Sequence, residues 1–369
     1  MPVQQFERTK SWTASRDKQG WMPDDVDLEE LTFRWSAEQV AALKSLTAGL
    51  VARGIDFKGV TRDNFRHPAL DDFIDGAVIS SRQGPGMVFF RDLPVEKFTV
   101  DELRIAFTGI GSYFGELLTQ SRHGDLMGEV TEQKDRVASQ RGYVVAKALP
   151  LHTDHSETAG LFCVEDAASG GENMFVSSIT LYDVIKREHP EYIPILERGF
   201  RMWLFDEQRL GRPPVTQHDV PVFSRKDGVF SCFMSIETAI PTADALSLPL
   251  SEIEKDAALF VLEARQRPEL GLKAGLGRGD CVFFNNFEVL HSRMPFDAHE
   301  GRPRHLLRLW LQEKGGDERP MVDAVPLYRF QNPSGLQGID GAEPEEVRMM
   351  NEAAKNPVSA HVMRALGNI

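Results

Sequence analysis

The chain has 369 residues, of which 41% are hydrophobic and 26% are charged, a composition typical of a globular protein that is long enough to bury a large core. Its formal net charge of −13 argues against nucleic acid or an anionic membrane surface as a partner. We therefore expect a small-molecule substrate. If this substrate is anionic, its pocket must be locally basic. The protein can also form a homo-oligomer.

The N-terminal residues lack the hydrophobic region of a signal peptide, and no hydrophobic run approaches the length of a membrane span. We expect a cytoplasmic location. Cys163, Cys232 and Cys281 lie far apart in hydrophobic runs and form no Cys-x-x-Cys pair. This spacing predicts neither a disulfide framework nor a zinc site, and favours three small buried side chains.

The first part of the chain is predicted to be helical after an irregular segment of about 35 residues. Ser36 and Gln39 form a capping box that starts a helix ending at Gly54, and residues 87–93 have the composition of a buried strand. Thr99 and Glu102 then cap a second helix. The core-facing side chains expected in this second helix are Leu103, Phe107, Ile110 and Phe114.

Gly109, Gly111 and Gly115 fall within the second helical pattern. Their spacing is not that of a G-x-G-x-x-G phosphate loop, and no strand directly precedes them. The glycines therefore indicate close helix packing.

From residue 140 onward the pattern is rich in short strands separated by turn residues, which favours a β-sandwich or barrel with peripheral helices. One capped helix over 251–268 interrupts the strands, and a short helix is expected over 344–355. The strands are expected at 143–151, 160–165, 173–178, 200–205, 220–223, 229–234, 271–274, 281–285 and 305–312. We expect a single domain over 1–369, in which a core of 85–313 carries an N-terminal extension (1–84) and a C-terminal extension (314–369).

His152 and Asp154 are two positions apart, so an extended segment directs both to one face and His155 to the other. His291, near the end of a later hydrophobic run, is the best candidate for a third ligand. Two histidines and one carboxylate are the ligand set of non-haem Fe(II) oxygenases. His155 could replace His152 in a shifted set, although it faces the wrong side of a regular strand. Six other histidines lack any partner spacing and are expected to be structural: His67, His123, His189, His218, His299 and His361.

Arg304 and Arg308 lie in a hydrophobic strand pattern whose alternation places them on one side, together with Leu306 and Trp310. Two arginines facing a cavity are costly unless an anion compensates them, and a carboxylate suits the planar guanidinium. The alternative is that both pair with acidic residues at the surface.

Several motifs together resemble the iron(II)/2-oxoglutarate-dependent oxygenases of the taurine dioxygenase and clavaminate synthase-like family. In chain order they are Phe114-Gly115-Glu116-Leu117, His152-Thr153-Asp154, Gly170-Gly171-Glu172-Asn173, Asn285-Asn286 with His291-Ser292-Arg293, and Arg304 with Arg308.

The resemblance implies a double-stranded β-helix, or jelly roll, in which His152, Asp154 and His291 bind Fe(II). It also implies that Arg304 binds the distal carboxylate of 2-oxoglutarate, and that Asn173 stands where the family often has a threonine with the same role. The implied reaction consumes O2, releases succinate and CO2, and oxidises an unactivated C–H bond. A carboxylate at Asp154 favours hydroxylation or desaturation, because related halogenases have a small residue there.

The segment from Leu118 to His123 departs from taurine dioxygenase, so taurine is not the expected substrate. Candidate substrate contacts are Gln120, Arg141, Tyr143 and Arg308, although the first three could equally make ordinary hydrogen bonds within loops. A small or medium polar molecule with a carboxylate or amino-acid-like group would suit the arginines.

Two other classes of function are alternatives. Jelly rolls also serve as non-redox metal-dependent isomerases or lyases and as small-molecule-binding proteins, but these have no need for the clamp that Arg304 would provide. A serine or cysteine hydrolase is disfavoured because no G-x-S-x-G nucleophile motif occurs.

Overall fold

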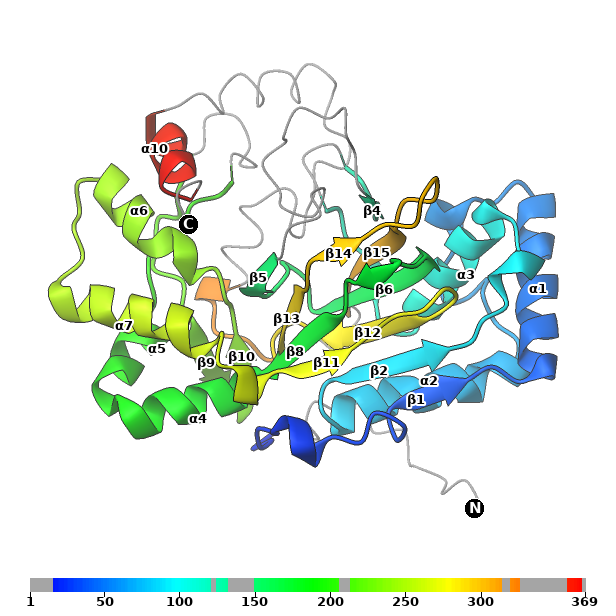
Figure 1. Cartoon of the computed structure of the whole chain (residues 1–369), viewed down its shortest axis with the longest axis horizontal. Helices are drawn as coiled ribbons and strands as arrows, with labels where there is room; N and C mark the ends of the chain where they lie inside the picture. Colours follow the sequence, from blue (N-terminus) through cyan, green and yellow to red (C-terminus); the bar gives the residue numbers. More distant parts are fainter. Residues whose placement is uncertain are drawn as a thin grey trace.

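The computed structural model describes residues 16–120, 124–131, 149–205, 213–313, 319–325 and 357–366. Two β-sheets pack face to face, and helices cover their outer sides at the two ends of the molecule (Figure 1). This arrangement confirms the predicted jelly roll with peripheral helices.

The larger sheet has the strand order β1-β2-β12-β6-β15-β3, and β4 also pairs with β15. All of its pairings are antiparallel except that of β1 with β2. The strands are β1 (Thr32–Arg34), β2 (Met87–Arg91), β3 (Glu116–Leu117), β4 (Met127–Thr131), β6 (Thr158–Glu165), β12 (Cys281–Asn285) and β15 (His305–Gln312).

The smaller sheet has the order β11-β8-β13-β5 and is antiparallel throughout. Its strands are β5 (Leu149–His152), β8 (Asn173–Ser177), β11 (Leu272–Ala274) and β13 (Val289–Arg293). Two further strand pairs lie outside the sheets: β7 (Ser169–Gly170) with β14 (Phe296–Asp297), and β9 (Phe223–Lys226) with β10 (Val229–Cys232).

Side-chain alternation divides the hydrophobic core into layers. In β2, Val88 and Phe90 face the helices, while Phe89 points between the sheets and meets Phe175 of β8 edge to face. β12 follows the same rule, since Phe283 faces outward and its neighbours in the strand face inward. The period of two therefore gives every central strand one face for the helices and one for the space between the sheets.

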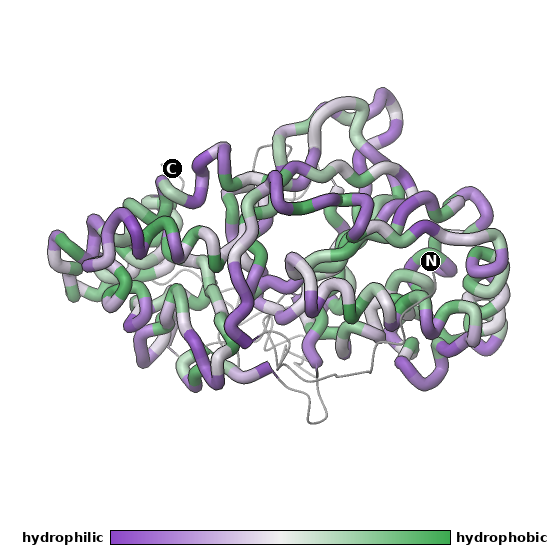
Figure 2. Tube along the Cα trace, turned by 90° about the horizontal axis from the view of Figure 1, so that it is seen from below, coloured by the Kyte–Doolittle hydropathy of each residue, from purple (hydrophilic) through white to green (hydrophobic). Residues whose placement is uncertain are grey.

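Helices α1 (Ala37–Ala52), α2 (Pro68–Gln83) and α3 (Val100–Gly111) pack on the outer face of the larger sheet. At the other end, α4 (Ser178–Glu188), α5 (Ile193–Arg198), α6 (Ala239–Ala245) and α7 (Glu252–Ala264) cover the smaller sheet, and α10 (Pro357–Leu366) packs on α6. Figure 2 shows hydrophilic and hydrophobic residues alternating along the helices at both ends, as expected of helices with one buried face. Single 3₁₀ turns occur at Pro23–Asp25, Phe57–Gly59, Val95–Lys97, Pro190–Tyr192, Ile236–Thr238 and Pro268–Leu270.

The predicted capping boxes at Ser36, Thr99 and Ser251 are confirmed, and each starts a helix. The predicted strand over 200–205 is wrong, because this segment makes only isolated bridges, to Val220 and Val215. Of the strand expected over 143–151, only the last part lies within the described residues, and the helix expected over 344–355 lies outside them.

Helices α2, α4, α5, α6 and α10 were not predicted. The start of α2 did carry a signal, because Pro68 occupies the first turn and the His67 ring accepts a hydrogen bond from the Ala69 backbone N–H.

The three cysteines are buried and unbridged, as predicted. Among the described residues, no helix is both long enough and hydrophobic enough to cross a bilayer.

Close packing explains the helix glycines. A Cβ on Gly109 would lie 2.2 Å from the ring of the buried Phe65, and one on Gly111 would lie 2.9 Å from Leu309 of β15. These glycines let α3 approach its neighbours closely, which confirms the packing interpretation over phosphate binding.

The substitution Gly109→Ala is expected to lower the free energy of unfolding by roughly 1–3 kcal/mol, because the new methyl group overlaps Phe65. Gly49→Ala in α1 is the matched control, since nothing lies within 4 Å of its Cβ, and it should raise stability by roughly 0.5–1 kcal/mol. Urea denaturation measures both. Equal effects of the two substitutions would contradict the packing role of Gly109.

Candidate metal centre

Two histidines from distant parts of the chain face each other across adjacent strands. His152 is the last residue of β5, and the antiparallel register pairs it with His291 of β13. Their ring centroids are 4.3 Å apart. The strand pairing of the smaller sheet therefore brings these two side chains together.

Asp154 follows the end of β5 and completes the cluster. Its Oδ1 lies 3.7 Å from His152 Nε2, and its Oδ2 lies 3.8 Å from His291 Nε2. Each residue offers a ligand atom within 4.8 Å of the others, and no other group of three such residues occurs in the described part of the chain. The predicted triad is thus assembled closely enough to share one ion.

The protonation states suit metal binding. Burial alone would raise the pKa of Asp154, but the positive charge of Arg308 and the two imidazoles hold it well below its usual value. Burial, followed by the charge of His152, lowers the pKa of His291 to about 3. The site therefore offers an ionised carboxylate and a neutral imidazole, the forms that bind a metal.

The second imidazole is oriented by the backbone. His152 Nδ1 lies 2.8 Å from the Pro150 carbonyl oxygen, so Nδ1 carries the proton and the Nε2 lone pair faces Asp154. Burial lowers the pKa of His152, but the hydrogen bond and charge of Asp154 outweigh burial and raise it overall. A metal would replace the proton that Nε2 can take up.

Asp154 is also fixed by neighbours that are not metal ligands. Trp310 Nε1 of β15 donates a hydrogen bond to Oδ2 at 2.7 Å, and Arg308 approaches the same oxygen at 3.4 Å. The Asp154 backbone N–H donates to Asn286 Oδ1, and Asn286 Nδ2 donates to Ser156 Oγ. The loop after β5 is thereby tied to β15 and to the segment before β13.

A small cavity of about 40 Å³ is lined by the two histidines of the triad, by Arg304 and by Asn173, but not by Asp154. Arg304 precedes β15 and is 3% exposed. One Arg304 nitrogen donates to the Gly171 carbonyl oxygen at 3.2 Å, while its NH1 and the Asn173 Nδ2 have no hydrogen-bond partner among the described residues. Buried donors without acceptors are costly, so the cavity suits an anion with several acceptor oxygens. These residues fit the distal carboxylate of 2-oxoglutarate.

A second guanidinium, that of Arg293, also favours an anion in this cavity. Arg293 and Arg304 both lie over the ring of Phe296, each 5.1 Å from its centroid. Burial, followed by the charge of Arg304, lowers the pKa of Arg293 to about 10. Two buried guanidinium groups against one aromatic ring favour an anionic ligand. Arg293 was not predicted as a site residue, and its only signal in the sequence is its place in the motif His291-Ser292-Arg293.

The Gly170-Gly171 turn allows the chain to pass close to Arg304. Gly170 and Gly171 have φ values of +68° and +74°, and a Cβ on Gly171 would lie 3.2 Å from Arg304 Nε. Glycine is therefore needed both for the left-handed backbone and for the close approach.

Arg308 lines the same cavity and is held by Gln120. Gln120 Oε1 accepts a hydrogen bond from Arg308 Nε at 2.8 Å, and its Nε2 donates to the carbonyl oxygens of Arg308 and Leu126. Gln120 thus orients Arg308. The other two predicted substrate contacts, Arg141 and Tyr143, lie outside the described residues.

His155 is not part of the triad. The prediction rested on alternation along a regular strand, but β5 ends at His152, so packing and not alternation places this ring. Its ring packs against Phe233, with centroids 5.3 Å apart, and against Trp310, with centroids 6.1 Å apart. It does not line the cavity that the two histidines share with Arg304.

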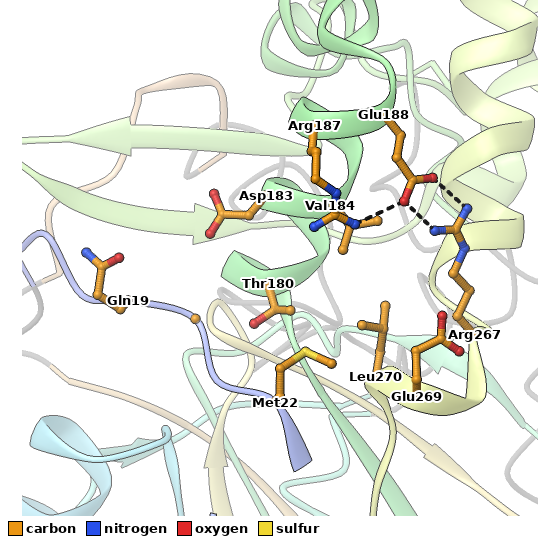
Figure 3. Close-up of a pocket in the computed structure, with 11 residues that line it drawn as sticks. Gln19, Met22, Thr180, Asp183, Val184, Arg187, Glu188, Arg267, Glu269 and Leu270 are labelled. Carbon is orange, nitrogen blue, oxygen red and sulfur yellow. Dashed lines mark hydrogen bonds and ion pairs between the residues drawn. The ribbon is translucent and has the colours of Figure 1, made fainter. Parts of the chain in front are cut away.

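A larger cavity of about 390 Å³ lies between the N-terminal segment, α4 and the turn after α7 (Figure 3). Its arginines already have partners, since Arg267 contacts Glu188 at 2.8 Å and Arg187 contacts Glu188 at 3.1 Å. None of the predicted site residues lines it. Its size alone therefore does not make it the functional site.

Comparisons with known proteins point to one family. A family model described as "Taurine catabolism dioxygenase TauD, TfdA family" matches residues 44–310. FR-33289 synthase of Streptomyces rubellomurinus is 29% identical over 245 residues, which are 64% of this chain and 72% of that protein. Taurine hydroxylase-like protein SAT17 of Stachybotrys chartarum is 26% identical over 311 residues, which are 79% of this chain and 78% of that protein.

Solved structures share the fold. Asparagine oxygenase (AsnO) aligns with a TM-score of 0.57 and 13% identity, over 76% of this chain and 92% of its own. The non-haem iron oxygenase OrfP, in complex with Fe and alpha-ketoglutaric acid, aligns with a TM-score of 0.55 and 13% identity, over 77% of this chain and 94% of its own.

Proposed function

Because the chain belongs to the TauD/TfdA family of non-haem iron, 2-oxoglutarate-dependent dioxygenases, we propose that it hydroxylates a small or medium polar substrate that carries a carboxylate or amino-acid-like group. The observation that carries the proposal is the two-histidine, one-carboxylate cluster, whose histidines line the same cavity as the buried Arg304. A non-redox isomerase, lyase or binding protein would not need a buried arginine for a co-substrate carboxylate beside its metal cluster.

Within this proposal, His152, Asp154 and His291 hold Fe(II). Arg304 and Asn173 receive the distal carboxylate of 2-oxoglutarate with donors that have no acceptor in the part of the chain that the structure describes. Bound iron with 2-oxoglutarate and O2 supplies the oxidation of a C–H bond, with release of succinate and CO2. Burial of Arg304 supports its role, because an ion pair is stronger where water is excluded.

The substrate class rests on Arg308. Its guanidinium lies beside the triad, held by Gln120, where it can pair with an anionic group of a substrate placed over the metal. Structures of similar fold contain amino acid products, (3S)-hydroxy-L-Arg in OrfP and 3-hydroxyasparagine in asparagine oxygenase, each with succinate. Arg141 and Tyr143 remain candidate substrate contacts, and a cytoplasmic location and a homo-oligomer remain expectations.

Replacing Arg304 tests the co-substrate site. With Fe(II), ascorbate and a substrate, Arg304→Ala should raise the KM for 2-oxoglutarate by on the order of 10²-fold, because it removes one partner of a buried charge pair. The measurement is succinate formation at varied 2-oxoglutarate. Arg302→Ala is the matched control, since Arg302 lies nearby in sequence but pairs with Glu165 at an exposed position. An unchanged KM in Arg304→Ala would contradict the assigned role.

A screen of free amino acids and their ester or amide derivatives tests the substrate class. Molecules with a free carboxylate should accelerate 2-oxoglutarate turnover, while derivatives with a blocked carboxylate should not. Arg308→Ala should raise the KM of the best substrate at least tenfold, with a much smaller change in the KM for 2-oxoglutarate. Equal acceleration by blocked derivatives, or an unchanged substrate KM in the variant, would argue against recognition through Arg308.

A further inference from the structure

Trp310 makes a buried polar contact with one residue of the triad. It lies in β15 and is 1% exposed, and its Nε1 donates to Asp154 Oδ2 at 2.7 Å. A buried indole N–H needs an acceptor, and a buried carboxylate needs donors. The bond therefore satisfies both groups at the edge of the triad.

The contacts of Asp154 divide between its two oxygens. Oδ2 receives Trp310 and, at a longer distance of 3.4 Å, Arg308, and it lies 3.8 Å from His291 Nε2. Oδ1 lies 3.7 Å from His152 Nε2, on the side away from both donors of β15. Both donors come from one face of β15, because they are two positions apart. One oxygen is therefore occupied by donors, and the other is available to an ion.

We propose that Trp310 is a positioning residue that fixes Asp154 as a single-oxygen ligand and presents Oδ1 to the metal. This inference rests on the proposed function, in which Asp154 binds Fe(II). Trp310 suits the task better than Arg308 because its ring is packed between the sheets and against His155, and its hydrogen bond is shorter. Arg308 lines the cavity, where a substrate can engage it.

The consequence is a site set in place before the ion arrives. Without the indole N–H, the Asp154 carboxylate can rotate or offer both oxygens, so metal binding has the added cost of fixing its orientation. The affinity for the metal should therefore fall even when 2-oxoglutarate and O2 are absent and no turnover occurs.

The test replaces Trp310 with benzothienylalanine, which keeps the fused ring but has sulfur in place of the N–H, and separately makes Trp310→Phe. Mn(II) is titrated calorimetrically into each protein without 2-oxoglutarate. We expect affinity to fall by about 10- to 100-fold in both, while a cooperative thermal transition shows that the metal-free benzothienylalanine protein is still folded.

Trp203 provides the matched control, because it is 2% exposed and its Nε1 donates to Ser359 instead. The same replacement there should leave Mn(II) affinity unchanged. Wild-type Mn(II) affinity in the Trp310 proteins, or an equal loss of affinity after replacement of Trp203, would overturn the role proposed for Trp310 and leave the proposed function standing. A wild-type protein that binds no Mn(II), or binds it equally well after His152→Ala, would overturn the proposed function as well.

Discussion

The buried carboxylate of Asp154 is the charge on which the site depends. An isolated carboxylate in a protein interior would take up a proton, yet its pKa is held far below the usual value. Arg308 and the two imidazoles lower this pKa, and the Trp310 N–H donates a hydrogen bond to the same carboxylate. These groups reach Asp154 from three different strands. Removing any one of them would leave a charge that the rest compensates less well.

The facing sheets make this convergence possible. The smaller sheet supplies both histidines through the register of β5 and β13, and β15 of the larger sheet supplies Arg308 and Trp310 from one face. Alternation along β15 sends its other side chains to the helices, so a single strand serves both the core and the cavity. Arg304, just before the same strand, places a second positive group in the cavity.

The sequence predicted the parts of the site that depend on local spacing. His152 and Asp154 were recognisable from their separation by two positions, and the arginines from strand alternation. His291 was placed with them by its motif and not by any local rule, because only the pairing of β5 with β13 makes them neighbours. The contacts of Trp310 and Gln120 were not predicted, since each depends on a partner far along the chain.

The fold was predicted unevenly for a similar reason. Helices α1, α3 and α7 begin with capping boxes that are visible in the sequence, and β12 and β15 are hydrophobic runs. By contrast, α4 begins directly where β8 ends, so one hydrophobic segment contains both a strand and a helix. Residues 200–205 have the composition of a strand but make only isolated bridges. Tertiary packing decides such cases over local preference.

A crystal structure of the protein with Mn(II) and 2-oxoglutarate, prepared without O2, tests the central claim most directly. The account predicts one ion bound by Nε2 of His152, Nε2 of His291 and Oδ1 of Asp154, with the distal carboxylate of 2-oxoglutarate against Arg304. An ion bound elsewhere, or a co-substrate whose distal carboxylate lies away from Arg304, would contradict it.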